Sequence, residues 1–143
     1  MIRVREIDHV VLRVRDLARS IAFYRDVLGC PVEKEQPGIG LWQLRAGRGL
    51  IDLVPVDGQL GAAGGGPPGK GERNVDHFCV RVDPFHEDAI RAHLARHGVT
   101  VGPTEARSGA EGVGPSIYIS DPDGNVVELK GPPERGGDPG FVK

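Results

Sequence analysis

The sequence feature that most restricts the possible folds is a strand-like segment that occurs twice. Residues 7–15 read IDHVVLRVR and residues 74–83 read NVDHFCVRVD, so that the Asp-His pair recurs at Asp76-His77. Side chains of a β-strand alternate between two faces. On that period each copy has one wholly apolar face and one face with a histidine and an arginine. The repeat therefore predicts two similar half-units whose histidines could converge on a common cleft.

Each half of the sequence predicts a strand, a helix and three further strands. In the first half, Asp16 can cap a helix and Gly29 ends it. The second half repeats this order, with Pro84 at the first helical turn and the turn sequence DPDGN before the last strand. The predicted strands are 7–15, 31–36, 39–45, 50–56, 75–82, 99–105, 116–120 and 126–130, and the predicted helices are 17–28 and 85–97.

The length of 143 residues predicts one domain. Within it we expect a first module at about 5–57, a linker at 58–73, a second module at about 74–130 and a C-terminal tail at 131–143. The linker is rich in Gly and Pro, which leaves little apolar surface to offset the entropy of ordering. We therefore predict that residues 59–71 are mobile or are ordered only by another subunit. We predict that the tail is extended or partly disordered unless a partner holds it.

Composition excludes several classes of partner. The net charge of −2 gives no basis for binding nucleic acid. No segment approaches the ~18 apolar residues of a membrane helix, so we expect no membrane partner. Two cysteines, Cys30 and Cys79, do not make a disulfide framework, which fits a reducing compartment. These observations predict a soluble cytoplasmic domain.

Each half also ends in a strand with one carboxylate among apolar residues. Asp52 lies in LIDLV and Glu128 lies in VVELK. Each half thus supplies a histidine on its first strand and a carboxylate on its last strand. Imidazole and carboxylate ligands together suit one divalent ion such as Zn, Ni, Co, Mn or Fe(II). The alternatives are that His9 and His77 are core histidines and that Asp52 is a solvated strand carboxylate.

The chain resembles the vicinal oxygen chelate superfamily, the glyoxalase / bleomycin-resistance / extradiol-dioxygenase group. The resemblance covers about residues 6–130. It rests on DHVVLRV, SIAFYRDVLG, VDHFCVRV and above all SIYISDPDGNVVEL. It implies an α+β fold of two tandem βαβββ modules that form a cup-shaped mixed sheet around a divalent metal.

Carried over by position, the resemblance also implies site residues. His9, His77 and Glu128 fall on the family's metal ligands, and Asp52 falls where glyoxalase I-like members place a fourth ligand, usually Glu. Arg13 falls where such enzymes hold a glutathione carboxylate, so glutathione is a possible co-substrate. The remaining positions match residues that bind substrate in fosfomycin-modifying relatives, namely Ser116 and Tyr118.

We therefore expect a metal-dependent, glyoxalase I-like lyase or isomerase that acts on a small carbonyl or thiohemiacetal substrate by enediolate stabilisation. Glu128 or Asp52 would transfer the proton as general base, and the protein would form a homodimer. One alternative is an Fe(II) extradiol-type dioxygenase, because two His and one Glu make a facial triad. Another is a resistance protein that binds an antibiotic or another small molecule without catalysis.

Overall fold

The computed structural model describes residues 1–134 of the chain. Its contacts separate two compact units, Met1–Asn74 and Val75–Lys143. In the described residues each unit forms one four-stranded sheet with both parallel and antiparallel neighbours. The predicted α+β class and the two β-α-β-β-β modules are thereby confirmed. Within residues 1–134, none of the helices is both long enough and apolar enough to span a bilayer.

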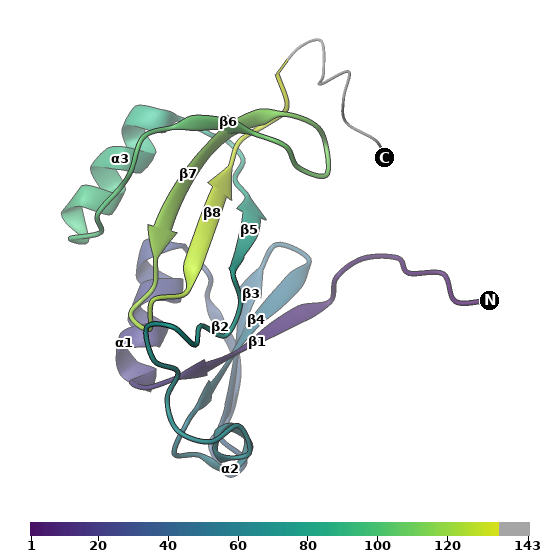
Figure 1. The fold of residues 1–143 in the computed structure, drawn as a ribbon, viewed down its shortest axis with the longest axis vertical. Coiled ribbons are helices and arrows are strands. Elements are labelled where there is room, and N and C mark those ends of the chain that lie inside the picture. The colour runs from purple at the N-terminus through teal and green to yellow at the C-terminus, as the bar shows by residue number, and fades with distance from the viewer. Residues whose placement is uncertain (135–143) are drawn as a thin grey trace. The chain divides into compact units, whose positions relative to one another are not determined.

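In the first unit the strand order is β1-β4-β3-β2, drawn in purple and blue in Figure 1. β1 pairs in parallel with β4, and the other neighbours are antiparallel. The parallel pairing places the first and last strands of the module beside each other. The elements are β1 His9–Val14, α1 Leu17–Ala22, the π-helix η1 Phe23–Val27, β2 Val32–Gln36, β3 Leu41–Ala46, β4 Gly49–Pro55 and α2 Gln59–Ala62.

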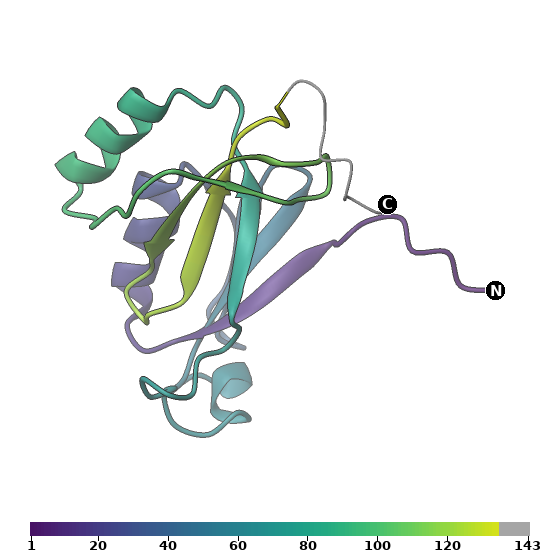
Figure 2. The ribbon, with the colours of Figure 1, turned by 45° about the horizontal axis from the view of Figure 1, so that its top comes forward.

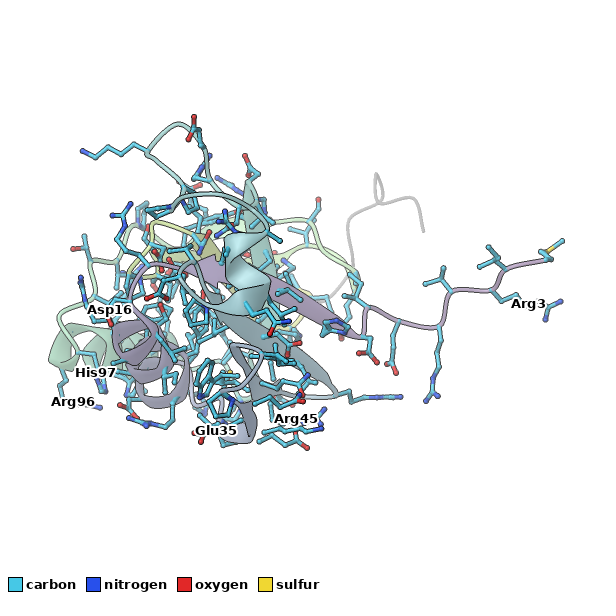
Figure 3. The ribbon with its side chains drawn as sticks, turned by 90° about the horizontal axis from the view of Figure 1, so that it is seen from below. Arg3, Asp16, Glu35, Arg45, Arg96 and His97 are labelled. Atoms are coloured by element: carbon cyan, nitrogen blue, oxygen red, sulfur yellow. The ribbon has the colours of Figure 1, made fainter. Side chains whose placement is uncertain are left out.

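The core of the first unit includes the apolar face of β1 and the helix that follows it. Leu12 and Val14 of β1 and Tyr24 of η1 are fully buried. Asp16 caps α1 by accepting a hydrogen bond from a backbone N–H of the first turn at 3.1 Å, and Figure 3 shows it at the start of this helix. α1 also contacts β4. The helix predicted for residues 17–28 is confirmed, with its second half wound as a π-helix.

The second unit repeats this plan with the strand order β5-β8-β7-β6. β5 pairs in parallel with β8, and the other neighbours are antiparallel. The buried apolar side chains are Leu94 of the helix and Ile117, Ile119, Val127 and Leu129 of the two central strands. The elements are β5 His77–Arg81, α3 Glu87–Arg96, β6 Glu105–Arg107, β7 Gly114–Ser120 and β8 Val126–Lys130.

The turn between β7 and β8 is closed by the buried carboxylate of Asp121. Its Oδ1 accepts hydrogen bonds from the backbone N–H groups of Asp123 and Asn125, at 2.9 and 2.8 Å. Its Oδ2 accepts a further bond from the side-chain amide of Asn125 at 2.8 Å. The sequence DPDGN is therefore explained by the geometry of the turn.

One expectation about local structure needs correction, and another lies mostly beyond the described residues. The strand predicted for residues 99–105 is wrong, because only Glu105–Arg107 forms a strand, β6. Pro103 lies in the predicted segment and has no N–H to donate to a neighbouring strand. The tail predicted at 131–143 lies outside the described residues from position 135 onward.

The linker at 58–73 contains the one-turn helix α2, which the sequence analysis did not predict. Arg13 of β1 donates from Nε to the carbonyl oxygen of Gly61 at 3.1 Å. Its Nη2 donates to the carbonyl oxygens of Gly65 and Gly66, the latter at 3.1 Å. Mobility of the linker stays a prediction, but these bonds attach its first half to the sheet of the same chain.

Candidate functional site

In the first unit, His9 of β1 and Asp52 of β4 lie on the same face of the sheet. The parallel register pairs Val11 with Asp52, and His9 is two positions from Val11, so both side chains point the same way. Asp52 is only 3% exposed. A buried carboxylate is costly unless it is paired or hydrogen-bonded, so this position requires a partner.

The partner of Asp52 in the structure is Gln43 of β3. Its side-chain Nε2 lies 3.2 and 3.3 Å from the two carboxylate oxygens and donates to them. The antiparallel register places the two residues opposite each other. An amide donor compensates burial of the carboxylate without cancelling its charge, so Asp52 stays available to a cation.

The second unit brings His77 of β5 and Glu128 of β8 into direct contact. Nε2 of His77 lies 3.4 Å from Oε2 of Glu128. The other carboxylate oxygen, Oε1, accepts a hydrogen bond from the hydroxyl of Ser116 at 2.6 Å. Because Glu128 is only 5% exposed, this bond holds the carboxylate in one orientation and leaves Oε2 facing the histidine.

Both histidines carry the same second interaction. Nδ1 of His9 lies 2.7 Å from Oδ1 of Asp8, and Nδ1 of His77 lies 2.7 Å from Oδ1 of Asp76. A carboxylate accepts, so in each case the Nδ1–H donates, and in the neutral imidazole this tautomer leaves the Nε2 lone pair for a metal ion. The hydrogen bond to Asp8 is also the main reason that the pKa of His9 is raised, with a smaller contribution from the charge of Asp52.

The aspartates of the repeated Asp-His pair were not among the predicted site residues. Histidines that bind metals commonly donate their other N–H to a carboxylate, which fixes the tautomer and the ring orientation. Asp8 and Asp76 occupy that position in the two units. The signal was present in the sequence as DH at the start of both strands.

The donor set fits a divalent cation. Two ligand atoms bound at ~2.1 Å to a tetrahedral ion lie about 3.4 Å apart, which is the separation of His77 Nε2 and Glu128 Oε2, 3.4 Å. Among residues 1–134, no three His, Cys, Asp or Glu side chains gather into a metal-binding group. Each unit instead presents one histidine and one carboxylate, and ligation of one ion by His9, His77, Glu128 and Asp52 together stays a prediction.

The three predicted substrate-binding residues have other contacts in the structure. Arg13 binds linker carbonyl groups, as described above. Ser116 is fully buried against Glu128. Tyr118 lies edge-on to the ring of His77, with ring centroids 5.8 Å apart, and burial together with the charge of Glu128 raises the pKa of its phenol. Their roles toward a substrate stay predictions.

A cavity of about 340 Å³ opens beside the pair in the second unit. His77 and Glu128 line it together with Cys79, whose pKa is raised to about 11 by burial and by the charge of Glu128. That shift makes Cys79 a neutral thiol at physiological pH. The pair is thus accessible to a small molecule.

Comparison with known proteins places this arrangement in a family context. Residues 6–129 match the model of the Glyoxalase/Bleomycin resistance protein/Dioxygenase superfamily. The chain is 32% identical over 124 residues to virulence protein STM3117 of Salmonella typhimurium, covering 86% of this chain and 81% of that protein. It is 35% identical over 129 residues to the glyoxalase domain-containing protein RDO1 of Mycosarcoma maydis, covering 88% and 68%. An integron cassette protein from V. cholerae superposes with a TM-score of 0.72 at 28% identity, covering 92% of this chain and 98% of that one.

Proposed function

Because the chain belongs to the Glyoxalase/Bleomycin resistance protein/Dioxygenase superfamily, we propose that it is a divalent-metal-dependent lyase or isomerase of glyoxalase I type. Its substrate would be a small carbonyl compound or a thiohemiacetal, with glutathione as a possible co-substrate. The observation that carries the proposal is the contact between His77 Nε2 and the buried Glu128. The same combination of histidine, supporting aspartate and buried carboxylate recurs in the first unit.

In this proposal one ion is held by four residues, His9, Asp52, His77 and Glu128. These residues would come from one chain or from the two chains of a homodimer. The ion, which could be Zn, Ni, Co, Mn or Fe(II), would polarise the carbonyl oxygen as a Lewis acid. Asp8 and Asp76 keep each imidazole in the tautomer that presents Nε2.

Glu128 is the proposed base that moves a proton between adjacent carbon atoms. Its Oε1 accepts a hydrogen bond from Ser116, so the proton would go to Oε2, the oxygen next to His77, which would have to leave the ion to take it up. Asp52 is the corresponding carboxylate of the first unit and the second candidate base. A positioned base of this kind is worth ~10²–10⁴-fold in rate.

The test is turnover of the hemithioacetal of methylglyoxal and glutathione by protein loaded separately with Ni, Co, Zn or Mn. We expect His9→Ala and His77→Ala to lose both stoichiometric metal binding and turnover. His93→Ala is the matched control, since His93 lies on α3 with its ring 4.7 Å from that of His97 and outside both pairs. Full activity of His77→Ala would reject the proposal.

A second candidate, an Fe(II) extradiol-type dioxygenase, is favoured by the contact of Gln43 with both oxygens of Asp52. If that amide keeps Asp52 from the ion, two histidines and Glu128 remain, and this triad leaves positions open for O₂. Oxygen uptake by Fe(II)-loaded protein with catechols distinguishes this candidate. Iron-dependent uptake without turnover of the hemithioacetal would replace the lyase by the dioxygenase, and inactivity in both assays would leave a binding role.

A further inference from the structure

Two cations lie side by side on the sheet face that carries His77 and Glu128. The parallel register of β5 and β8 pairs Cys79 with Glu128 and, two positions further along, Arg81 with Lys130. Alternate positions on a strand share a face and lie ~6.6 Å apart, because the rise is ~3.3 Å per residue. Arg81 and Lys130 therefore lie two residues beyond Cys79 and Glu128 on the same face. Both line the cavity beside His77 and Glu128.

Lys130 is buried, although it carries a full charge. It is only 5% exposed, and in residues 1–134 the hydrogen-bond partners of its ammonium group are the carbonyl oxygens of Arg107 and Gly114, the latter at 3.3 Å. A Cβ atom at Gly109 would come within 2.3 Å of the lysine Cε, so the glycine leaves room for this side chain. Carbonyl groups satisfy the donors but do not neutralise the charge, and a buried cation favours a nearby anion.

A carboxylate of the protein already lies in this cavity. Glu111 belongs to the glycine-rich loop between β6 and β7, which extends past β5 in Figure 2. Its Oε1 accepts a hydrogen bond from Nε of Arg81 at 2.8 Å. The two side chains are 34% and 56% exposed, and ion pairs this exposed are weak enough to open readily. Another anion can therefore compete with Glu111 for Arg81.

We propose that Arg81 and Lys130 form a subsite for an oxyanion of the substrate, which Glu111 occupies until the substrate displaces it. The subsite would accept a carboxylate, phosphate or phosphonate group a few bonds from the reacting carbonyl carbon. This statement about the substrate rests on the proposed function, but binding of the oxyanion itself does not.

The test is isothermal titration of metal-free protein at low ionic strength with methylphosphonate and, separately, with propionate. We expect saturable binding, weakened about ten-fold or more in Arg81→Gln, since hydrogen bonds between charged groups carry that much. Glu111→Gln should bind roughly 1.5- to 5-fold more tightly, because the competing ion pair is removed. The better of the two probes identifies the class of anion.

Glu33→Gln is the matched control, because Glu33 forms a similarly exposed ion pair with Arg45 in the first unit, at 2.6 Å. It should leave binding unchanged. Lys130→Met should also weaken binding, provided that circular dichroism shows that the variant folds. If it does not fold, Arg81→Gln and Glu111→Gln test the subsite without it. Equal affinity in wild type, Arg81→Gln and Glu111→Gln would overturn the subsite.

The outcome is separable from that of the proposed function. Anion binding that depends on Arg81 in a protein without turnover would retain the subsite and reject the lyase. Turnover by the metal-loaded protein, with no anion binding to the cavity, would retain the lyase and reject the subsite.

Discussion

Gln43 donates its side-chain amide to both carboxylate oxygens of Asp52, at 3.2 and 3.3 Å. This contact bears directly on whether the metal would have three or four protein ligands. A carboxylate already satisfied by an amide loses that bond if it turns toward an ion. The strength of the contact therefore influences both the stability of the metal-free protein and the gain on metal binding.

Gln43→Leu should destabilise the metal-free protein by about 1–3 kcal/mol, because it leaves a buried carboxylate without its donor. If Asp52 is a ligand, saturating metal should restore most of this loss, and the metal-induced increase in Tm should exceed that of the wild type. Thermal unfolding with and without metal measures both quantities. An unchanged metal-induced increase would indicate a three-ligand site.

Asp8→Asn and Asp76→Asn should each lower metal affinity by ~10–100-fold, because a neutral amide is a weaker acceptor and can present its N–H₂ instead, which favours the wrong histidine tautomer. The fold should be unaffected, since both aspartates are largely exposed, at 88% and 82% of their side chains. Competition with a metal-sensitive dye measures the affinity. Asp88→Asn, in the exposed first turn of α3, is the control, and loss of affinity there too would indicate a general effect of charge.

Glu128→Gln should abolish turnover, with a decrease of at least ~10²–10⁴-fold in kcat from loss of the base. Ser116→Ala should have a smaller effect that falls on kcat and leaves metal bound, because Ser116 orients Oε1 without taking up the proton. Steady-state kinetics and metal content of both variants separate these roles. A Glu128→Gln enzyme that turned over at the wild-type rate would transfer the catalytic role to Asp52.

Arg13→Ala should release the linker, because Arg13 donates to three of its carbonyl groups. Limited proteolysis with trypsin should then cleave first after Lys70, at a higher rate than in the wild type, with the fragments identified by mass. Arg19→Ala, an exposed change in α1, should not alter the rate. If Arg13 also holds substrate, the same variant should raise KM more than it lowers kcat.

Asp121→Ala should destabilise the second unit by at least ~2 kcal/mol, because the buried carboxylate accepts three hydrogen bonds in the β7–β8 turn. Chemical denaturation measures the free energy of unfolding. Asp88→Ala, in the exposed first turn of α3, is the control. Similar losses in both variants would contradict the role assigned to Asp121.

The succession of strands and helices along the chain and the sharing of strand faces could be predicted, because they follow from local periodicity and from a repeat. His9 with Asp52, and His77 with Glu128, lie on common faces as the alternation indicated. The contact between Gln43 and Asp52 could not be predicted. It depends on which residues of β3 and β4 lie opposite each other, and the local sequence around Gln43 does not specify that register.

The contacts of Arg13 and Lys130 could not be predicted from the sequence for a different reason. Both side chains bind backbone carbonyl groups of loops. Every residue has a carbonyl group, so the sequence contains no signal for such an acceptor. In the sequence, Lys130 stands out only as a charged residue at the end of the mostly apolar strand VVELK.

The parallel pairing of first and last strands also has a consequence for biosynthesis. All the bonds that shape the His9–Asp52 pair come from residues 8–52, which are translated before any part of the second unit. The side chains of this pair and their hydrogen-bond partners are therefore all present on a nascent chain before the second unit is synthesised. The second pair likewise draws on residues 76–128. Each pair is thus encoded by its own stretch of messenger RNA.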